Sequence, residues 1–194
     1  MRRSNERRRG VGLVELLITL AITAALLTAT AMAVNGAISA YSINAAQSDT
    51  MHRSRIALER LSTYIRTSTA HSPFDETLAT QFAGGTTVTD TGISLFDTND
   101  VELSFRFDES AGHLLVTENG REHVLLRGVQ QFNVSMEPMR SASSIKAGGG
   151  HDQLRRATLT LTVAFDGATT GVRARDAAET VTLSTAVVPR KNIW

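Results

Sequence analysis

The sequence predicts an α+β fold in which one long amino-terminal helix packs on an antiparallel β-sheet. Two observations predict it. No Pro or Gly interrupts residues 37–70, and apolar residues recur there with helical spacing. After residue 100 the chain instead alternates apolar and polar residues in short runs that turn residues separate, which is typical of antiparallel strands. A helix with one apolar stripe and a sheet with one apolar face bury these surfaces against each other.

The first ten residues form a basic leader. They hold five arginines and one glutamate, a net charge of +4, whereas the rest of the chain holds 15 basic and 18 acidic side chains, a net charge of −3. Basic segments beside a membrane helix stay on the cytoplasmic side, so we expect the leader to remain there and the remainder to cross. The positive charge is therefore a topology signal, and we expect no nucleic-acid partner.

An uncharged apolar stretch follows at residues 16–38. As a helix it is about 35 Å long, which suffices to cross a bilayer. Small residues and threonines are frequent in it, and small residues allow helices to approach closely. A cleavable secretory signal is the alternative, because Ala29, Ala31 and Ala33 imitate a cleavage site. The apolar run is too long for a typical signal peptide, so we favour a membrane-spanning helix.

Glu15 is a lone carboxylate at the start of this stretch. Burying such a charge in hydrocarbon costs at least ~2.5–3.5 kcal/mol, so it needs a partner. If the chain is cut after Gly10, Val11 becomes the amino terminus and Glu15 the fifth residue. One chain's carboxylate then neutralises a neighbour's α-amine where the dielectric is low, and the pairing sets the register between helices. The alternative is an ordinary signal anchor with an incidental acidic residue.

The segment RRRGVGLVELL resembles the processing signal of type IV prepilins and type II secretion pseudopilins. Val11 and Gly12 depart from the family, which usually has Phe or Met and then often Thr, whereas residues 13–17 follow the pattern. The resemblance implies that a prepilin peptidase cuts between Gly10 and Val11 and N-methylates Val11, and that Glu15 acts in subunit assembly. The later segments GVQQFNVSME and VVPRKN resemble minor pseudopilins of the J type, and PilW-like minor pilins share much of this.

Four segments follow from these patterns: a leader at 1–10, a transmembrane and assembly helix at 11–38, its amphipathic continuation at 39–70, and a β-rich head at 71–194. In the continuation one apolar stripe contains Met51, Leu58, Leu61 and Ile65. We expect one rod to about Ser68, with a possible bend at Gly36, and expect Ser72-Pro73 to end it.

Six strands are predicted in the head, with a hairpin turn at Asn119-Gly120. They cover residues 101–107, 113–117, 122–127, 129–136, 156–165 and 179–188. Residues 74–99 carry a weaker pattern, which we interpret as a loop with one or two short strands.

Residues with catalytic or metal-binding spacing are scarce. The chain has no cysteine, which excludes thiol nucleophiles, thiolate zinc sites and iron–sulfur clusters. Its five histidines lack paired-ligand spacing, and we expect them at the surface. We therefore predict neither an enzyme nor a cofactor. A weak calcium candidate is formed by hard oxygen ligands close in sequence, with a solvated turn as the alternative: Asp97, Asn99, Asp100 and Glu102.

The first hypothesis for function is a minor pseudopilin, a structural subunit that helps to initiate or cap a type II secretion pseudopilus. The resemblance implies three kinds of partner besides the membrane: a prepilin peptidase, other pseudopilins or pilins that contact the amino-terminal helix, and an inner-membrane assembly platform. It also implies a single-pass protein of the bacterial inner membrane with a periplasmic head. The alternatives are a type IV minor pilin in adhesion, motility or DNA uptake, and a membrane-anchored periplasmic enzyme.

Overall fold

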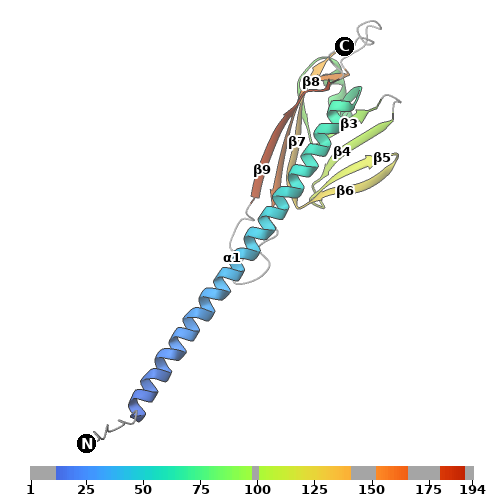
Figure 1. Cartoon of the computed structure of the whole chain (residues 1–194). Coiled ribbons are helices and arrows are strands. Elements are labelled where there is room, and N and C mark those ends of the chain that lie inside the picture. Colours follow the sequence, from blue (N-terminus) through green and yellow to red (C-terminus); the bar gives the residue numbers. More distant parts are fainter. Residues whose placement is uncertain (1–11, 98–100, 141–151, 166–179, 191–194) are drawn as a thin grey trace, which may run out of the picture. The chain divides into compact units, whose positions relative to one another are not determined.

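The computed structural model describes residues 12–97, 101–140, 152–165 and 180–190. By its contacts the chain divides into two compact units, residues 1–44 and residues 45–194. In the first unit the described residues from Leu13 onward are helical. The second unit contains the rest of that helix, a short second helix and all the strands (Figure 1).

Helix α1 spans Leu13–Thr67. The helix continues without interruption through Gly36, the position of the possible bend. Its end agrees with the prediction: the amide and the hydroxyl of Ser68 both donate to the carbonyl oxygen of Tyr64, at 2.9 and 2.7 Å. The expectation that Ser72-Pro73 ends the helix was wrong. These residues belong to strand β1, Ala70–Pro73, because the chain leaves the helix five residues earlier and enters a sheet.

The strands form two antiparallel sheets, whereas the sequence predicted one. The first has the order β1-β3-β4-β5-β6 and the second has the order β2-β7-β8-β9. Their bounds are β2 Val88–Asp90, β3 Gly92–Phe96, β4 Glu102–Asp108, β5 His113–Glu118, β6 Arg121–Arg127, β7 Val129–Met139, β8 Gln153–Ala164 and β9 Thr180–Val187. All six predicted strands are present, and each end lies within three residues of its predicted place.

Two turns explain the course of the chain through the first sheet and into the second. Asn119 and Gly120 have φ angles of 52° and 72° and join the paired residues Glu118 and Arg121, as a two-residue hairpin requires. Gly128 follows β6, with a φ of 75°, and the chain enters the second sheet at the next residue. Its carbonyl oxygen accepts a hydrogen bond from the amide of Ala164 at 2.9 Å, which ties the crossing point to β8.

Residues 74–99 contain more structure than the sequence indicated. Helix α2 spans Glu76–Ala83, and its N-cap Asp75 accepts a hydrogen bond from the amide of Thr77 at 2.8 Å. Strands β2 and β3 follow. Neither helix α2 nor the pairing of β3 with β1 was predicted. Helix α2 has only eight residues, and the two strands are short and lie about twenty residues apart in the sequence.

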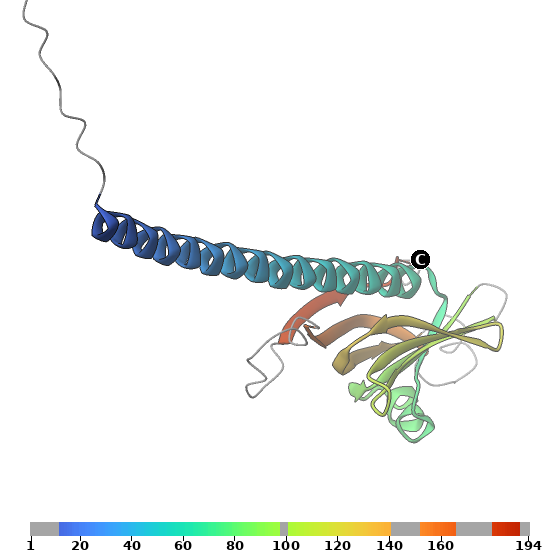
Figure 2. The same ribbon diagram turned by 90° about the horizontal axis from the view of Figure 1, so that it is seen from below.

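The core of the second unit lies between α1 and the two sheets (Figure 2). Leu61 and Ile65 are completely buried, together with large apolar side chains of both sheets, among them Phe105, Phe132, Leu159 and Leu161. Leu58 is also buried, and Met51 is half-buried. The predicted α+β layout, a long helix packed on antiparallel strands, is therefore confirmed.

Candidate functional site

Glu15 lies in the first turn of α1. Its side chain is exposed, and its Oε2 atom lies 3.4 Å from the backbone amide of Gly12. A carboxylate in the first turn interacts favourably with the positive end of the helix dipole. Within the described part of the chain Glu15 forms no ion pair. It is also the only charged residue from Gly12 to Ser48.

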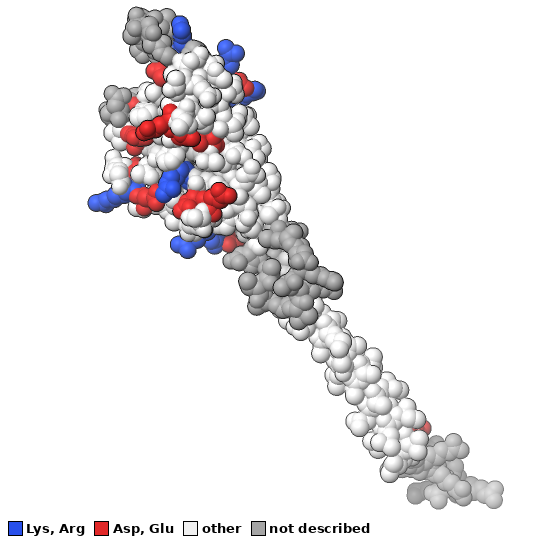
Figure 3. Space-filling view, turned by 180° about the vertical axis from the view of Figure 1, so that it is seen from behind, with Lys and Arg blue, Asp and Glu red and all other residues white. Residues whose placement is uncertain are grey.

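The surface around and beyond Glu15 is apolar. Among the described residues, one helix, α1, is long and apolar enough to span a membrane. In Figure 3 its amino-terminal segment is almost entirely white, the colour of residues other than Lys, Arg, Asp and Glu. Large side chains along it are more than half exposed, for example Leu16, Leu20, Leu26, Met32 and Ile38. So much continuous apolar surface is unfavourable in water and needs a lipid or protein cover.

Four threonines in this segment do not interrupt its apolar character. Each hydroxyl donates to a carbonyl oxygen four residues earlier in the same helix: Thr19 to Glu15 and Thr23 to Thr19 at 2.6 Å, Thr28 to Ala24 at 2.8 Å, and Thr30 to Leu26 at 2.7 Å. A hydroxyl without a partner is costly in an apolar medium. Because these hydroxyls are satisfied internally, the segment suits lipid or close packing with other helices.

The remaining predicted site residues are only partly described. Gly10 and Val11, the predicted cleavage and methylation positions, lie outside the described residues, as do Asn99 and Asp100 of the calcium candidate. Asp97 accepts a hydrogen bond from the amide of Val101 at 2.9 Å, and Glu102 begins β4. No cluster of three potential metal ligands occurs among the described residues. The calcium site therefore stays a prediction.

His71 contradicts the expectation that the histidines lie at the surface. It is 2% exposed, and its Nε2 atom lies 3.1 Å from the carbonyl oxygen of Ile65. The pKa of His71 falls from 6.5 to about 4, mainly because burial disfavours the charged imidazolium, while the Ile65 carbonyl and the Asp152 carboxylate oppose that shift. The position of His71 in a short strand beside the end of α1 explains its burial.

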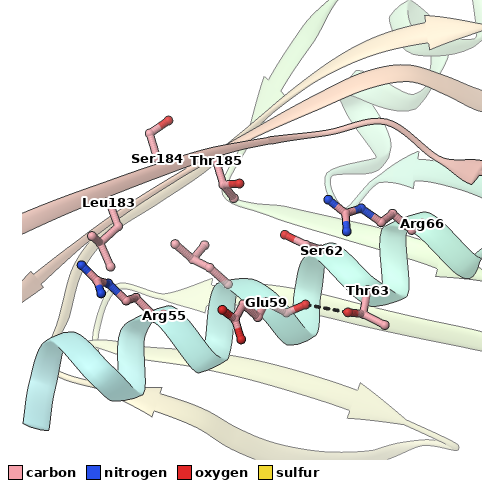
Figure 4. Close-up of a pocket in the computed structure, with 9 residues that line it drawn as sticks. Arg55, Glu59, Ser62, Thr63, Arg66, Leu183, Ser184 and Thr185 are labelled. Carbon is pink, nitrogen blue, oxygen red and sulfur yellow. Dashed lines mark hydrogen bonds between the residues drawn. The ribbon is translucent and has the colours of Figure 1, made fainter.

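A groove that was not predicted from the sequence lies between α1 and β9 (Figure 4). We call it the β9 groove. It has a volume of about 560 Å³ and is lined by Arg55, Leu58, Glu59, Ser62, Thr63, Arg66, Leu183, Ser184 and Thr185. The only signal in the sequence is the lack of charge in the segment TVTLSTAV.

Comparison with known proteins concerns the amino-terminal segment. Residues 6–31 match the family model of the prokaryotic N-terminal methylation motif, and the match does not extend into the β-rich head. No curated protein and no solved structure matches the chain. The motif and the apolar helix suggest membrane anchoring. A methylation motif at the start of a long helix that packs on antiparallel strands is consistent with a prepilin-like protein.

Proposed function

We propose that the protein is a minor pseudopilin, a non-catalytic structural subunit of a type II secretion pseudopilus. The methylation motif at residues 6–31 carries this proposal. A prepilin peptidase cuts between Gly10 and Val11 and methylates the new amino terminus. The subunit then joins its siblings at an inner-membrane assembly platform, and its head lies in the periplasm.

The geometry of α1 supports a role in assembly. Glu15 is the single charge in a surface of exposed apolar side chains. A neighbouring helix that covers this surface must therefore also supply a positive or hydrogen-bonding partner for the carboxylate. The α-amine of a processed neighbour has the opposite charge and lies at the same end of its helix. Burying the two together costs far less than burying either alone.

The topology follows from charge. The leader holds five arginines, whereas the twenty residues after the apolar stretch hold two, Arg53 and Arg55. This excess of positive charge keeps the amino terminus in the cytoplasm, and the head crosses the membrane. A type IV minor pilin in adhesion, motility or DNA uptake has the same processing signal and the same layout. The later strands resemble J-type minor pseudopilins and, in large part, PilW-like minor pilins. The net charge of −3 outside the leader disfavours a DNA-binding head, so we favour secretion.

The mass of the intact protein extracted from the membrane tests the proposal. We expect the mass of a chain that starts at Val11 and carries one additional methyl group. A terminus within residues 29–34 would show that signal peptidase acts here, and the prepilin proposal would then be wrong. Loss of exoprotein secretion on deletion of the gene, with pili intact, separates the secretion subunit from a pilus subunit.

A further inference from the structure

Strand β9 is an open edge of the second sheet. In the strand order β2-β7-β8-β9 it pairs only with β8 among the described residues. An edge strand presents backbone amides and carbonyls that are able to pair with another chain. Natural proteins protect such edges with charged residues, proline or very short strands.

The other three edges carry such protection, and β9 does not. Strand β6 has charged or titratable side chains at Arg121, Glu122, His123 and Arg127. Strand β1 has four residues and ends in Pro73, and β2 has three residues. Strand β9 has eight residues with no charge and no proline. Its lack of protection indicates that the edge is covered in the assembled protein.

The β9 groove shows what kind of side chains such a partner needs. Leu183 and Thr185 point toward α1, whereas Ser184 points away from it (Figure 4). Leu58 adds a second apolar contact on the helix side. Arg55 and Arg66 lie in different turns of α1 along the groove, and neither has an ion-pair partner among the described residues. A partner strand therefore fits best with an uncharged middle and a carboxylate that reaches one of these arginines.

The direction of β9 excludes a second copy of this chain that pairs with β9 through its own β9 in the antiparallel direction. Thr180 pairs with Ala164, which lines a second groove together with Asp49 near the start of this unit's helix. Thr185 lies in the β9 groove with Arg66, near the helix end. Strand β9 thus runs in the same direction as α1 in this unit. Antiparallel pairing of two copies through β9 would place their membrane-proximal ends at opposite ends of the pair, so one membrane could not anchor both.

We propose that β9 accepts a strand from a neighbouring prepilin-like subunit of different sequence, which extends the second sheet across the subunit boundary. The incoming strand pairs with the backbone of β9, places uncharged side chains over Leu58 and Leu183, and presents a carboxylate to Arg55 or Arg66. Because the partner is a subunit of the same assembly, this inference rests on the proposed function.

Photo-crosslinking in producing cells tests the inference with the full chain. A photo-reactive amino acid replaces Ser184, which points away from α1, and in a matched control it replaces His123 on the protected edge β6. We expect the probe at position 184 to capture one protein that itself carries an N-terminal methylation motif. The captured peptide should be uncharged in its middle and contain Asp or Glu. The control should not capture this protein.

Two further variants test the edge itself. Ala186 is exposed on β9, so Ala186→Lys adds a protecting charge without disturbing the core, and Ala186→Val leaves the edge neutral. We expect the lysine variant to lose the crosslink from position 184 and the valine variant to keep it. Arg55→Glu should weaken the crosslink by repelling the partner's carboxylate.

Several results would overturn the inference. These are capture of a second copy, a crosslink within one chain, equal capture by the probe at position 123, or no capture at all. The mass of the protein in the same samples separates this inference from the proposed function. A correctly cut and methylated chain without the crosslink refutes only strand addition, whereas an uncut chain refutes the prepilin role.

Discussion

The Nε2 atom of His71 lies 3.1 Å from the carbonyl oxygen of Ile65, and this contact joins strand β1 to the last turns of α1. Because a carbonyl oxygen only accepts, the neutral imidazole carries its proton on Nε2, and this N–H donates a hydrogen bond to the Ile65 carbonyl oxygen. The amide of His71 also donates to the carbonyl oxygen of Asp152 at 2.7 Å, so the residue connects three parts of the head. The Nδ1 atom of His71 and the Oδ1 atom of Asp152 are buried and have no hydrogen-bond partner among the described residues.

Stability should therefore depend on pH through His71. Its pKa is about 4 in the folded protein and 6.5 in the unfolded chain, so between these values the unfolded chain binds the proton that the folded protein does not. The free energy of unfolding is unaffected above pH 6.5 and falls as the pH drops toward 4. The difference in pKa corresponds to a loss of about 3 kcal/mol at the acid end. Urea unfolding of the detergent-solubilised chain from pH 7 to pH 4 measures this loss.

Two variants isolate this effect. His71→Gln keeps a side-chain amide that is able to donate to the Ile65 carbonyl but does not titrate, so its unfolding midpoint should change less between pH 6.5 and 4. His123→Gln, at an exposed histidine of β6, is the control for removing a histidine as such. If the unfolding midpoint of His71→Gln falls as much between pH 6.5 and 4 as that of the unsubstituted chain, other groups cause the acid sensitivity.

Replacing Leu61 by Ala should destabilise the head strongly. Leu61 is completely buried between α1 and the sheets, and truncating such a side chain leaves a cavity that costs roughly 2–5 kcal/mol. Ile56 lies on the same helix and is 39% exposed, so Ile56→Ala should cost much less. Urea midpoints compare the two variants. Similar midpoints would mean that the apolar stripe of α1 does not anchor the sheets.

Gly128 should tolerate a side chain poorly for a purely backbone reason. An added Cβ would meet only ordinary contacts, the nearest being the carbonyl oxygen of Ala164 at 3.6 Å, but its φ of 75° is unfavourable for any residue with a side chain. We expect Gly128→Ala to lower the free energy of unfolding by about 1–2 kcal/mol. Gly84 has a φ of −77°, so Gly84→Ala should change stability far less. Equal effects of the two changes on the thermal midpoint would contradict this account.

The sequence predicted the fold where the signal is local. Helical spacing placed Leu58, Leu61 and Ile65 on the buried stripe, and Asn119-Gly120 marked a hairpin that the backbone angles confirm. It could not divide the strands between two sheets, because this division depends on which strands pair across long separations. The short strand β1 pairs with β3 about twenty residues later, and no local pattern announces such a contact.

The candidate site shows the same limit. A motif of adjacent residues was sufficient to predict the processing signal, and the family model matches the same region. The burial of His71 and the β9 groove arise from residues far apart in sequence, such as Arg55 and Leu183. For β9 the sequence does indicate an uncharged strand, but only the strand order shows that this strand lies at an edge.

Cleavage should depend on Gly10 and not on Glu15. If the peptidase acts beside Val11 on the cytoplasmic side, as we propose, Gly10→Asp should leave an uncut precursor in the membrane. Glu15→Leu changes a residue in the first turn of the helix and leaves the cleavage position intact. The mass of each membrane-extracted variant, compared with the unsubstituted chain, checks both expectations. A cut Gly10→Asp protein would place the cleavage elsewhere.

Glu15→Leu should instead impair assembly. The substitution removes a charge that is costly in lipid, so membrane insertion should be at least as efficient as before. It also removes the proposed partner for a neighbour's α-amine, and breaking such a buried pair typically costs roughly 3–5 kcal/mol. We therefore expect the variant to be cut and methylated normally but to be poorly recovered with its sibling subunits.

Thr19→Val is a matched control in the next turn, because the hydroxyl that it removes bonds only to the carbonyl oxygen of Glu15. A subunit at the filament tip has no neighbour above it and depends on one pairing fewer, so the loss should be smaller there than for an internal subunit. Normal recovery of Glu15→Leu in the assembled complex would show that this carboxylate does not set the register between helices.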